Sequence, residues 1–170
     1  MEPWGAALYG DPCEACGFDW SLTPQEALGW VSGWGPRLAE VTAGAEGTER
    51  RPPRRWSVTE YVCHVGDNLR QWSERVQSAL LAQQPAVGGY DPDALAAARG
   101  YAALPLPVAA WSSRLAATTW VEVLGRALHD NVELQHVTRG TQTAADVARN
   151  NCHDAHHHLW DIEQILSLRL

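Results

Sequence analysis

The last part of the chain repeats apolar residues at a spacing that suits an α-helix. The segment begins at Thr143, a good N-cap residue, and runs to about Leu168. At about 100° per residue its apolar residues form a stripe along one face. They are Ala144, Ala148, Cys152, Ala155, Leu159, Ile162 and Leu166. The sequence therefore predicts a long amphipathic helix with one face in a helical core.

Three further long segments show the same helical period. Capping boxes at Thr23 and Ser57 mark the starts of the first two, and Pro36 should bend or interrupt the first. The apolar side of the third includes Trp111 and Leu115. The three predicted helices cover residues 23–42, 58–81 and 108–128.

The rest of the chain lacks a long period. Residues 1–22 form an irregular leader, and a short helix is expected at 91–99. No convincing strand and no internal repeat is found, and three stretches are expected to be loops, namely 43–55, 83–90 and 129–141. These features predict an all-α protein, a single four-helix-bundle domain over residues 1–170 with long crossovers.

Composition excludes some functions. The formal net charge is -7, and all 13 cationic residues are arginine without a basic stripe, so nucleic-acid binding is not expected. No run of about 18 apolar residues could span a membrane. The N-terminus lacks the pattern of a secretory signal. We therefore expect a cytoplasmic protein whose four cysteines are reduced thiols.

A dense histidine cluster lies in the last predicted helix, at residues 151–162. His153 and His157 are one turn apart, opposite the apolar stripe, and could hold one divalent metal. His64, on the flank of the stripe of the 58–81 helix, could supply a third ligand. Three protein ligands with an open position are typical of a catalytic metal. Alternatively, these histidines are simply solvated on a polar face.

The other histidines and the cysteines have plainer interpretations. His158 lies near the apolar stripe and is expected to pack, whereas His156 is either exposed or a spare ligand. The CxxC pair, Cys13 and Cys16, is either half of a metal site or part of the local packing of the leader, and we expect local packing. The remaining two, Cys63 and Cys152, are expected to be small core residues.

Acidic and aromatic residues near the proposed ligands suggest further roles. Asp161, four residues after His157, could accept a hydrogen bond from an imidazole ligand. Three carboxylates are candidate general bases, namely Glu60, Asp67 and Asp154. Three tryptophans could wall a binding cleft, namely Trp56, Trp72 and Trp160.

Three blocks of the sequence carry a resemblance to a known family. They are Cys13–Trp20 (CEACGFDW), Trp56–Asp67 (WSVTEYVCHVGD) and His153–Ile162 (HDAHHHLWDI). In this order they resemble the DinB/YfiT superfamily, and especially the actinobacterial DinB-like proteins with a CxxC leader. The resemblance implies a metal-binding four-helix bundle whose three ligands map onto His64, His153 and His157. It also implies a divalent metal, often zinc or nickel, and a possible homodimer.

The same resemblance suggests what the chain does. Some relatives use a low-molecular-weight thiol, such as mycothiol, for S-transfer or isomerisation, and others are hydrolase-like. The first hypothesis is thus a metal-dependent thiol S-transferase acting on a small-molecule substrate. The second is a metal-dependent hydrolase, and the third is a non-enzymatic metal- or ligand-binding bundle. Where many relatives have Glu after the first histidine of the last helix, this chain has Asp154, which leaves the substrate open.

Overall fold

The computed structural model describes residues 1–81 and 86–167. The remaining residues, 82–85 and 168–170, include the start of the loop predicted at 83–90 and the predicted end of the last helix, and these lie outside the described part. Within the described part the chain is mainly helical with one small sheet, which confirms the expected fold class. No helix in that part is long and apolar enough to cross a bilayer.

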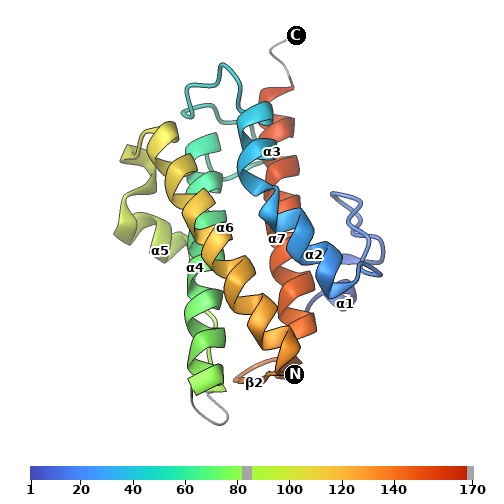
Figure 1. Ribbon diagram of the computed structural model, residues 1–170. Helices are drawn as coiled ribbons and strands as arrows, with labels where there is room; N and C mark the ends of the chain where they lie inside the picture. Colours follow the sequence, from blue (N-terminus) through green and yellow to red (C-terminus); the bar gives the residue numbers. More distant parts are fainter. Residues whose placement is uncertain (82–85, 168–170) are drawn as a thin grey trace.

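Four rows of helix make a bundle (Figure 1). Three rows are the long helices α4 (Val58–Leu81), α6 (Leu106–His129) and α7 (Ala144–Leu166). The fourth row is made by α2 (Pro24–Ser32) followed by α3 (Trp34–Val41). Helix α4 packs on α6 and α7, and the α2–α3 pair packs on the same two helices. The core between them includes Trp34, Leu69, Trp120, Leu124 and Ile162, all at most 1% exposed.

The helix starts follow the predicted capping boxes. Thr23 and Glu26 bond each other at the start of α2, and Ser57 and Glu60 do so at the start of α4. The predicted first helix breaks at Gly33 and not at Pro36. Pro36 instead lies in the first turn of α3. Backbone N–H groups of the first turn have no partner within the helix, so proline, which lacks this group, is tolerated there.

The apolar face of α6 differs from the prediction. Trp111 and Leu115 are 55% and 52% exposed, because smaller residues of α6, such as Ser113, face the core. Helix α4 comes close to α6 there: a Cβ placed on Gly66 would lie 3.0 Å from the Ser113 Cα. The glycine therefore allows the two helices to approach closely.

A sheet occupies two stretches that the sequence assigns to loops. Strand β2 (Glu133–His136) pairs parallel with β1 (Ala86–Val87) and antiparallel with β3 (Gly140–Thr143). Alternate residues of β2, Leu134 and His136, are buried. Strands of two to four residues are too short to show a period of two, which explains why they were missed. Three short helices, α1 (Ala6–Tyr9), α5 (Pro92–Arg99) and the 3₁₀-helix η1 (Tyr101–Ala103), complete the fold.

Buried hydrogen bonds fix the rotation of α7 about its own axis. The Trp120 indole N–H of α6 donates to Asn151 Oδ1 at 2.9 Å, and Asn151 Nδ2 donates to Asn68 Oδ1 of α4 at 2.9 Å. Thr143 ends β3 and caps α7, with its side chain accepting from the Asp146 N–H. The helix is thus held at its start and near its middle, just before the histidine cluster.

Replacing Gly66 with alanine should destabilise the protein. The added methyl group would meet backbone and side-chain atoms of Ser113, so G66A should lower the free energy of unfolding by about 1–3 kcal/mol. Gly125 in α6 is a matched control, because a Cβ there would meet nothing within 4 Å. Alanine at that position should stabilise the helix by up to about 1 kcal/mol. Urea unfolding of both variants tests this, and equal effects would contradict the close approach.

Candidate metal centres on helix α7

Helix α7 presents two pairs of possible metal ligands, each pair one turn apart. His153 and His157 form the first pair, and Asp154 and His158 form the second. The pairs are offset by one residue, which turns them by about 100° around the helix. They therefore point toward different neighbours, the first toward the leader (residues 1–22) and the second toward α4.

The pair facing α4 forms a group with His64. Asp154 Oδ1 lies 3.6 Å from His64 Nε2 and 3.6 Å from His158 Nε2. The three ligand atoms all lie within 4.8 Å of one another, and we refer to this group as the cavity site. Burial raises the pKa of Asp154, but the nearby charges of His64 and His158 outweigh it and lower this pKa to about 2. Asp154 is therefore an anionic donor between two imidazoles.

Hydrogen bonds orient the imidazole of His158. Its Nδ1 lies 3.0 Å from Asp161 Oδ2, which leaves Nε2 directed toward Asp154 and His64. Asp161 is itself held by Arg54, whose Nε donates to Oδ1 at 3.0 Å. Carboxylates that hold the far nitrogen of a metal-ligating histidine in this way fix its tautomer and orientation. His158 was expected only to pack, and the structure instead directs a ring nitrogen into the cavity site.

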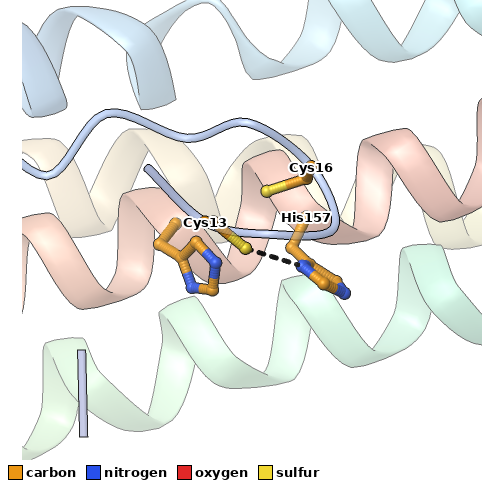
Figure 2. A group of neighbouring side chains, drawn as sticks. Cys13, Cys16 and His157 are labelled. Atoms are coloured by element: carbon orange, nitrogen blue, oxygen red, sulfur yellow. Dashed lines mark hydrogen bonds between the residues drawn. The ribbon is translucent and has the colours of Figure 1, made fainter. Parts of the chain in front are cut away.

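The pair facing the leader forms a group with the two cysteines of the CxxC motif. Cys13 Sγ lies 3.9 Å from His157 Nδ1, and Figure 2 shows Cys13 and Cys16 directed toward the helix from the leader loop. The ligand atoms of Cys13, Cys16, His153 and His157 all lie within 4.8 Å of one another, and we refer to them as the leader site. The two cysteines thus face donors of α7 and do not pack within the leader alone.

Aromatic residues of the leader cover the His153 side of α7. The rings of Tyr9, Phe18 and Trp20 lie 4.5–5.3 Å from the His153 ring, measured between centroids. His153 is consequently only 4% exposed, and this burial is the main cause that lowers its pKa to about 4. The leader thus covers this face, which the sequence placed toward water or a cleft, and His153 also lines the cavity described below.

The three ligands predicted from the sequence are divided between the two groups. His64 belongs to the cavity site, whereas His153 and His157 belong to the leader site. The ligand atoms of the three do not form one group, because His64 lies against Asp154 of α7, although His64 and His153 both line the cavity described below. The predicted metal ligands remain candidate ligands, but of two centres.

The predicted general bases have different surroundings. Glu60 caps α4 through the Ser57 N–H and pairs with Arg50 at 2.5 Å. Asp67 accepts from the Tyr101 hydroxyl at 2.5 Å and pairs with Arg99 and Arg70. Both carboxylates are thus engaged away from the cavity site. Asp154 is the one of the three that lies in it.

The predicted tryptophan walls lie at several places. The ring of Trp56 is 4.9 Å from that of His64, beside the cavity site. Trp160 lies 5.6 Å from the His157 ring and under the Arg54 guanidinium. Trp72 lines the cavity described next and stacks near His136. The other predicted core residues, Cys63 and Cys152, are packed in or against the core, where burial raises the pKa of each thiol to about 12.

A cavity of about 260 Å³ opens beside the cavity site. His64, Asp154 and His153 line it, whereas Cys13, Cys16 and His157 do not. The leader supplies part of the wall, with Trp4, Gly5, Leu8 and Tyr9, and the other lining side chains include Trp72, Arg75, Tyr90, His136, Arg139 and Asn150. The cavity site is therefore accessible to a small molecule, and of the four leader-site residues His153 also reaches the cavity.

Several of these lining residues escaped sequence reasoning. Arg75 lies on α4 eleven residues after His64, and Arg139 lies within the stretch 129–141 that was assigned to loop. His136 is buried because it alternates with Leu134 along β2. The signal that could have found His158 was present, since Asp154 and His158 repeat the i, i+4 spacing of His153 and His157.

The donor sets fit a divalent metal. Two imidazoles and a carboxylate make a set that zinc accepts in catalytic sites, and two thiolates with two imidazoles make a closed structural set. In the described residues, His64 Nδ1 and His153 Nε2 are buried without hydrogen-bond partners. Buried polar atoms of this kind call for an explanation, and an ion at the leader site would supply one for His153. His64 faces Asp154 with its other nitrogen, Nε2. The two groups together support a metal-dependent function.

Removing the charge of Asp161 should weaken metal binding. D161N keeps the shape of the side chain but gives His158 Nδ1 and Arg54 a neutral partner. Loss of such a supporting carboxylate costs about 10–100-fold in metal affinity. Competition with a chromophoric chelator measures this loss. E163Q, on the exposed side of the same turn, is the control and should keep the wild-type affinity.

Comparison with known proteins adds one similarity. No protein-family model and no curated protein matches the sequence. Among solved structures, the chain is similar to YfiT from Bacillus subtilis, described as a probable metal-dependent hydrolase with an unusual four-helix bundle topology. The match has a TM-score of 0.74 and 16% sequence identity, and it covers 85% of this chain and 86% of YfiT. The chain therefore has the four-helix-bundle fold of the DinB/YfiT type.

Proposed function

We propose that the chain is a divalent-metal-dependent enzyme that joins a low-molecular-weight thiol, such as mycothiol, to an electrophilic small molecule in the cavity. His64, Asp154 and His158 would hold the metal, with zinc or nickel suited to this set. The observation that carries the proposal is that two of these donors line a cavity of about 260 Å³. A site that is open on one side leaves room for a substrate.

The surroundings of the site favour a thiol as the nucleophile. When bound, a divalent metal lowers the pKa of a thiol or a water molecule that coordinates it. Water as the nucleophile usually works with a carboxylate base nearby. Among the described residues, however, Asp154 is the sole carboxylate lining the cavity, and it belongs to the ligand group. A thiol needs less help, because the thiolate forms more readily and is the reactive species.

Two arginines give the cavity a positive side. Arg75 and Arg139 both line it, together with the anionic Asp154. Guanidinium groups bind carboxylates and phosphates well. These residues would therefore hold an acidic group of the thiol or of its partner. A reduced thiol as co-substrate is also consistent with a cytoplasmic location.

Metal-dependent hydrolysis is the second candidate. It is favoured by the similarity to YfiT, a probable metal-dependent hydrolase. His136 lines the same cavity, and burial is the main cause that lowers its pKa, so its imidazole is neutral near pH 7. Its Nδ1 accepts from the Thr138 N–H at 3.3 Å, so Nε2 carries the proton of the neutral ring and can donate a hydrogen bond that orients a water molecule or substrate. In this alternative the same three ligands serve, and no thiol is consumed.

One experiment separates the two candidates. Zinc- or nickel-loaded protein is incubated with a panel of chromogenic electrophiles, including halonitroarenes and aryl esters, with and without mycothiol. Product formation that requires the thiol supports S-transfer, and equal turnover without it supports hydrolysis. D154N, which keeps the size of the side chain but removes its charge, should lose either activity. Metal binding without turnover of any compound would oppose both and leave a binding bundle.

A further inference from the structure

We propose that Cys13, Cys16, His153 and His157 bind a second metal ion, a structural zinc that fastens the leader to helix α7. This inference does not depend on the reaction at the cavity site. It adds a closed centre of four protein ligands to the open centre of three. Its role would be to hold the leader in place as one wall of the cavity beside the cavity site.

The first argument is the convergence of four zinc-type donors from two distant parts of the chain. Cys13 and His157 are 144 residues apart in sequence, yet Cys13 Sγ lies 3.9 Å from His157 Nδ1. Two ligands of one tetrahedral zinc, a sulfur and a nitrogen, lie about 3.6 Å apart. The observed separation is close to this value. Figure 2 shows the Cys13 sulfur directed toward His157, with Cys16 on the same loop.

The second argument is the shape of the CxxC loop. The Gly17 N–H donates to the Cys13 carbonyl at 2.8 Å, and the Cys13 N–H donates to the Phe18 carbonyl at 2.9 Å. Gly17 has a φ of 71°, which residues other than glycine rarely adopt. These bonds close a tight turn that places Cys13 and Cys16 side by side, so the two thiols are pre-organised before any ion binds.

The third argument is a buried imidazole nitrogen that lacks a partner. His153 is 4% exposed, and its Nε2 has no hydrogen-bond partner in the described chain. Tyr9, Phe18 and Trp20 surround the ring. These aromatic neighbours offer the Nε2 atom no hydrogen-bond partner. Leaving a buried polar atom unsatisfied costs free energy. Participation of this histidine in a metal centre explains why it is buried there.

The fourth argument is a carboxylate behind His157. Its Nδ1 faces Cys13, while its Nε2 lies 3.8 Å from Asp161 Oδ2. Histidine ligands of metals commonly have a carboxylate on the far side of the ring. The same Asp161 oxygen is 3.0 Å from His158 Nδ1 of the cavity site. One carboxylate thus lies behind an imidazole of each centre, within hydrogen-bond distance of His158 and in a longer charge contact with His157.

The position of the leader gives this centre a consequence for the active site. The leader lines the cavity beside the cavity site with Trp4, Gly5, Leu8 and Tyr9. Besides the ring contacts of its aromatic residues with His153, the described leader is joined to the body by hydrogen bonds such as Glu2 N–H to the Thr138 carbonyl and Arg149 Nε to the Leu22 carbonyl. A metal at the leader site would therefore fix the cavity wall in place.

Cobalt substitution of the full chain tests the proposal. Cobalt in a site with two thiolates shows a thiolate-to-cobalt charge-transfer band in the near ultraviolet, and tetrahedral cobalt shows strong visible bands. We expect both in the wild-type protein, and we expect C13S/C16S to lose the charge-transfer band while still binding one ion at the cavity site. C63S is the matched thiol control and should keep the full spectrum, because Cys63 lies outside both groups.

A second measurement uses the wild-type protein and therefore does not depend on whether C13S/C16S folds. Zinc-loaded wild-type protein is treated with an alkylating reagent and analysed by peptide mass spectrometry, before and after chelation. Cys13 and Cys16 should be protected by zinc and become several-fold more reactive when zinc is removed. Limited proteolysis within the leader should accelerate in parallel. The proposal is overturned if cobalt gives no thiolate band in the wild type, or if the two cysteines form a disulfide or react equally with and without zinc.

Discussion

Zinc at the leader site should raise the thermal midpoint by about 8–16 °C when its free concentration exceeds the dissociation constant about a thousandfold. Binding to the folded state alone contributes about 4 kcal/mol under that condition. For a chain of this size, each kcal/mol shifts the midpoint by about 2–4 °C. Because unfolding separates Cys13 from His157, the unfolded chain has no preformed site and the binding energy stabilises the fold.

Calorimetry at a series of free zinc concentrations measures this effect. The part of the zinc-dependent rise in thermal midpoint that comes from the leader site should vanish in C13S/C16S and persist in C63S. The remaining shift in C13S/C16S would come from the cavity site. A zinc-dependent shift of equal size in wild type and C13S/C16S would show that the cysteines contribute no binding energy, which would contradict a metal at the leader site.

His158→Ala should have the largest effect on activity. The change removes one of three ligands from the cavity site, so the site's metal affinity and the metal-dependent turnover should fall by more than about 100-fold, beyond the usual loss for a supporting residue. His156→Ala is the matched control. His156 is the neighbouring histidine on the same turn, but it packs against Phe18 and Trp30 and belongs to neither group.

His153→Ala distinguishes this arrangement from the single site expected from the sequence. In a site made of His64, His153 and His157, H153A would abolish turnover and H158A would leave it intact. In the observed arrangement, H153A should loosen the leader and raise KM, while kcat at saturating substrate changes little. Steady-state kinetics of both variants with added metal decide between the two. Full activity of H158A would contradict the cavity site.

The sequence predicted the helices of the bundle well because their signals are local. The capping pairs of Thr23 with Glu26 and of Ser57 with Glu60 mark helix starts without help from the rest of the fold. The apolar stripe of α7 is buried as predicted, apart from its partly buried last member, Leu166. The strands β1, β2 and β3 were missed because two to four residues cannot display a period.

The candidate site was only half predictable because α7 offers two ligand pairs with the same spacing. Nothing local decides whether His64 meets His153 and His157 or meets Asp154 and His158. That choice depends on how α7 is rotated, which Asn151 fixes through Trp120 and Asn68 of two other helices. It also depends on the leader, which looks irregular in sequence but folds over the first pair.

The most direct test of two separate centres is the metal content per chain, measured by elemental analysis after zinc loading and gel filtration. Two ions are expected in the wild type. One should remain in C13S/C16S, and one should remain in H64A and in H158A. The combined variant of C13S/C16S with H158A should retain none. A single ion in the wild type that is lost from H64A, H153A and H157A but retained in H158A and C13S/C16S would contradict this account.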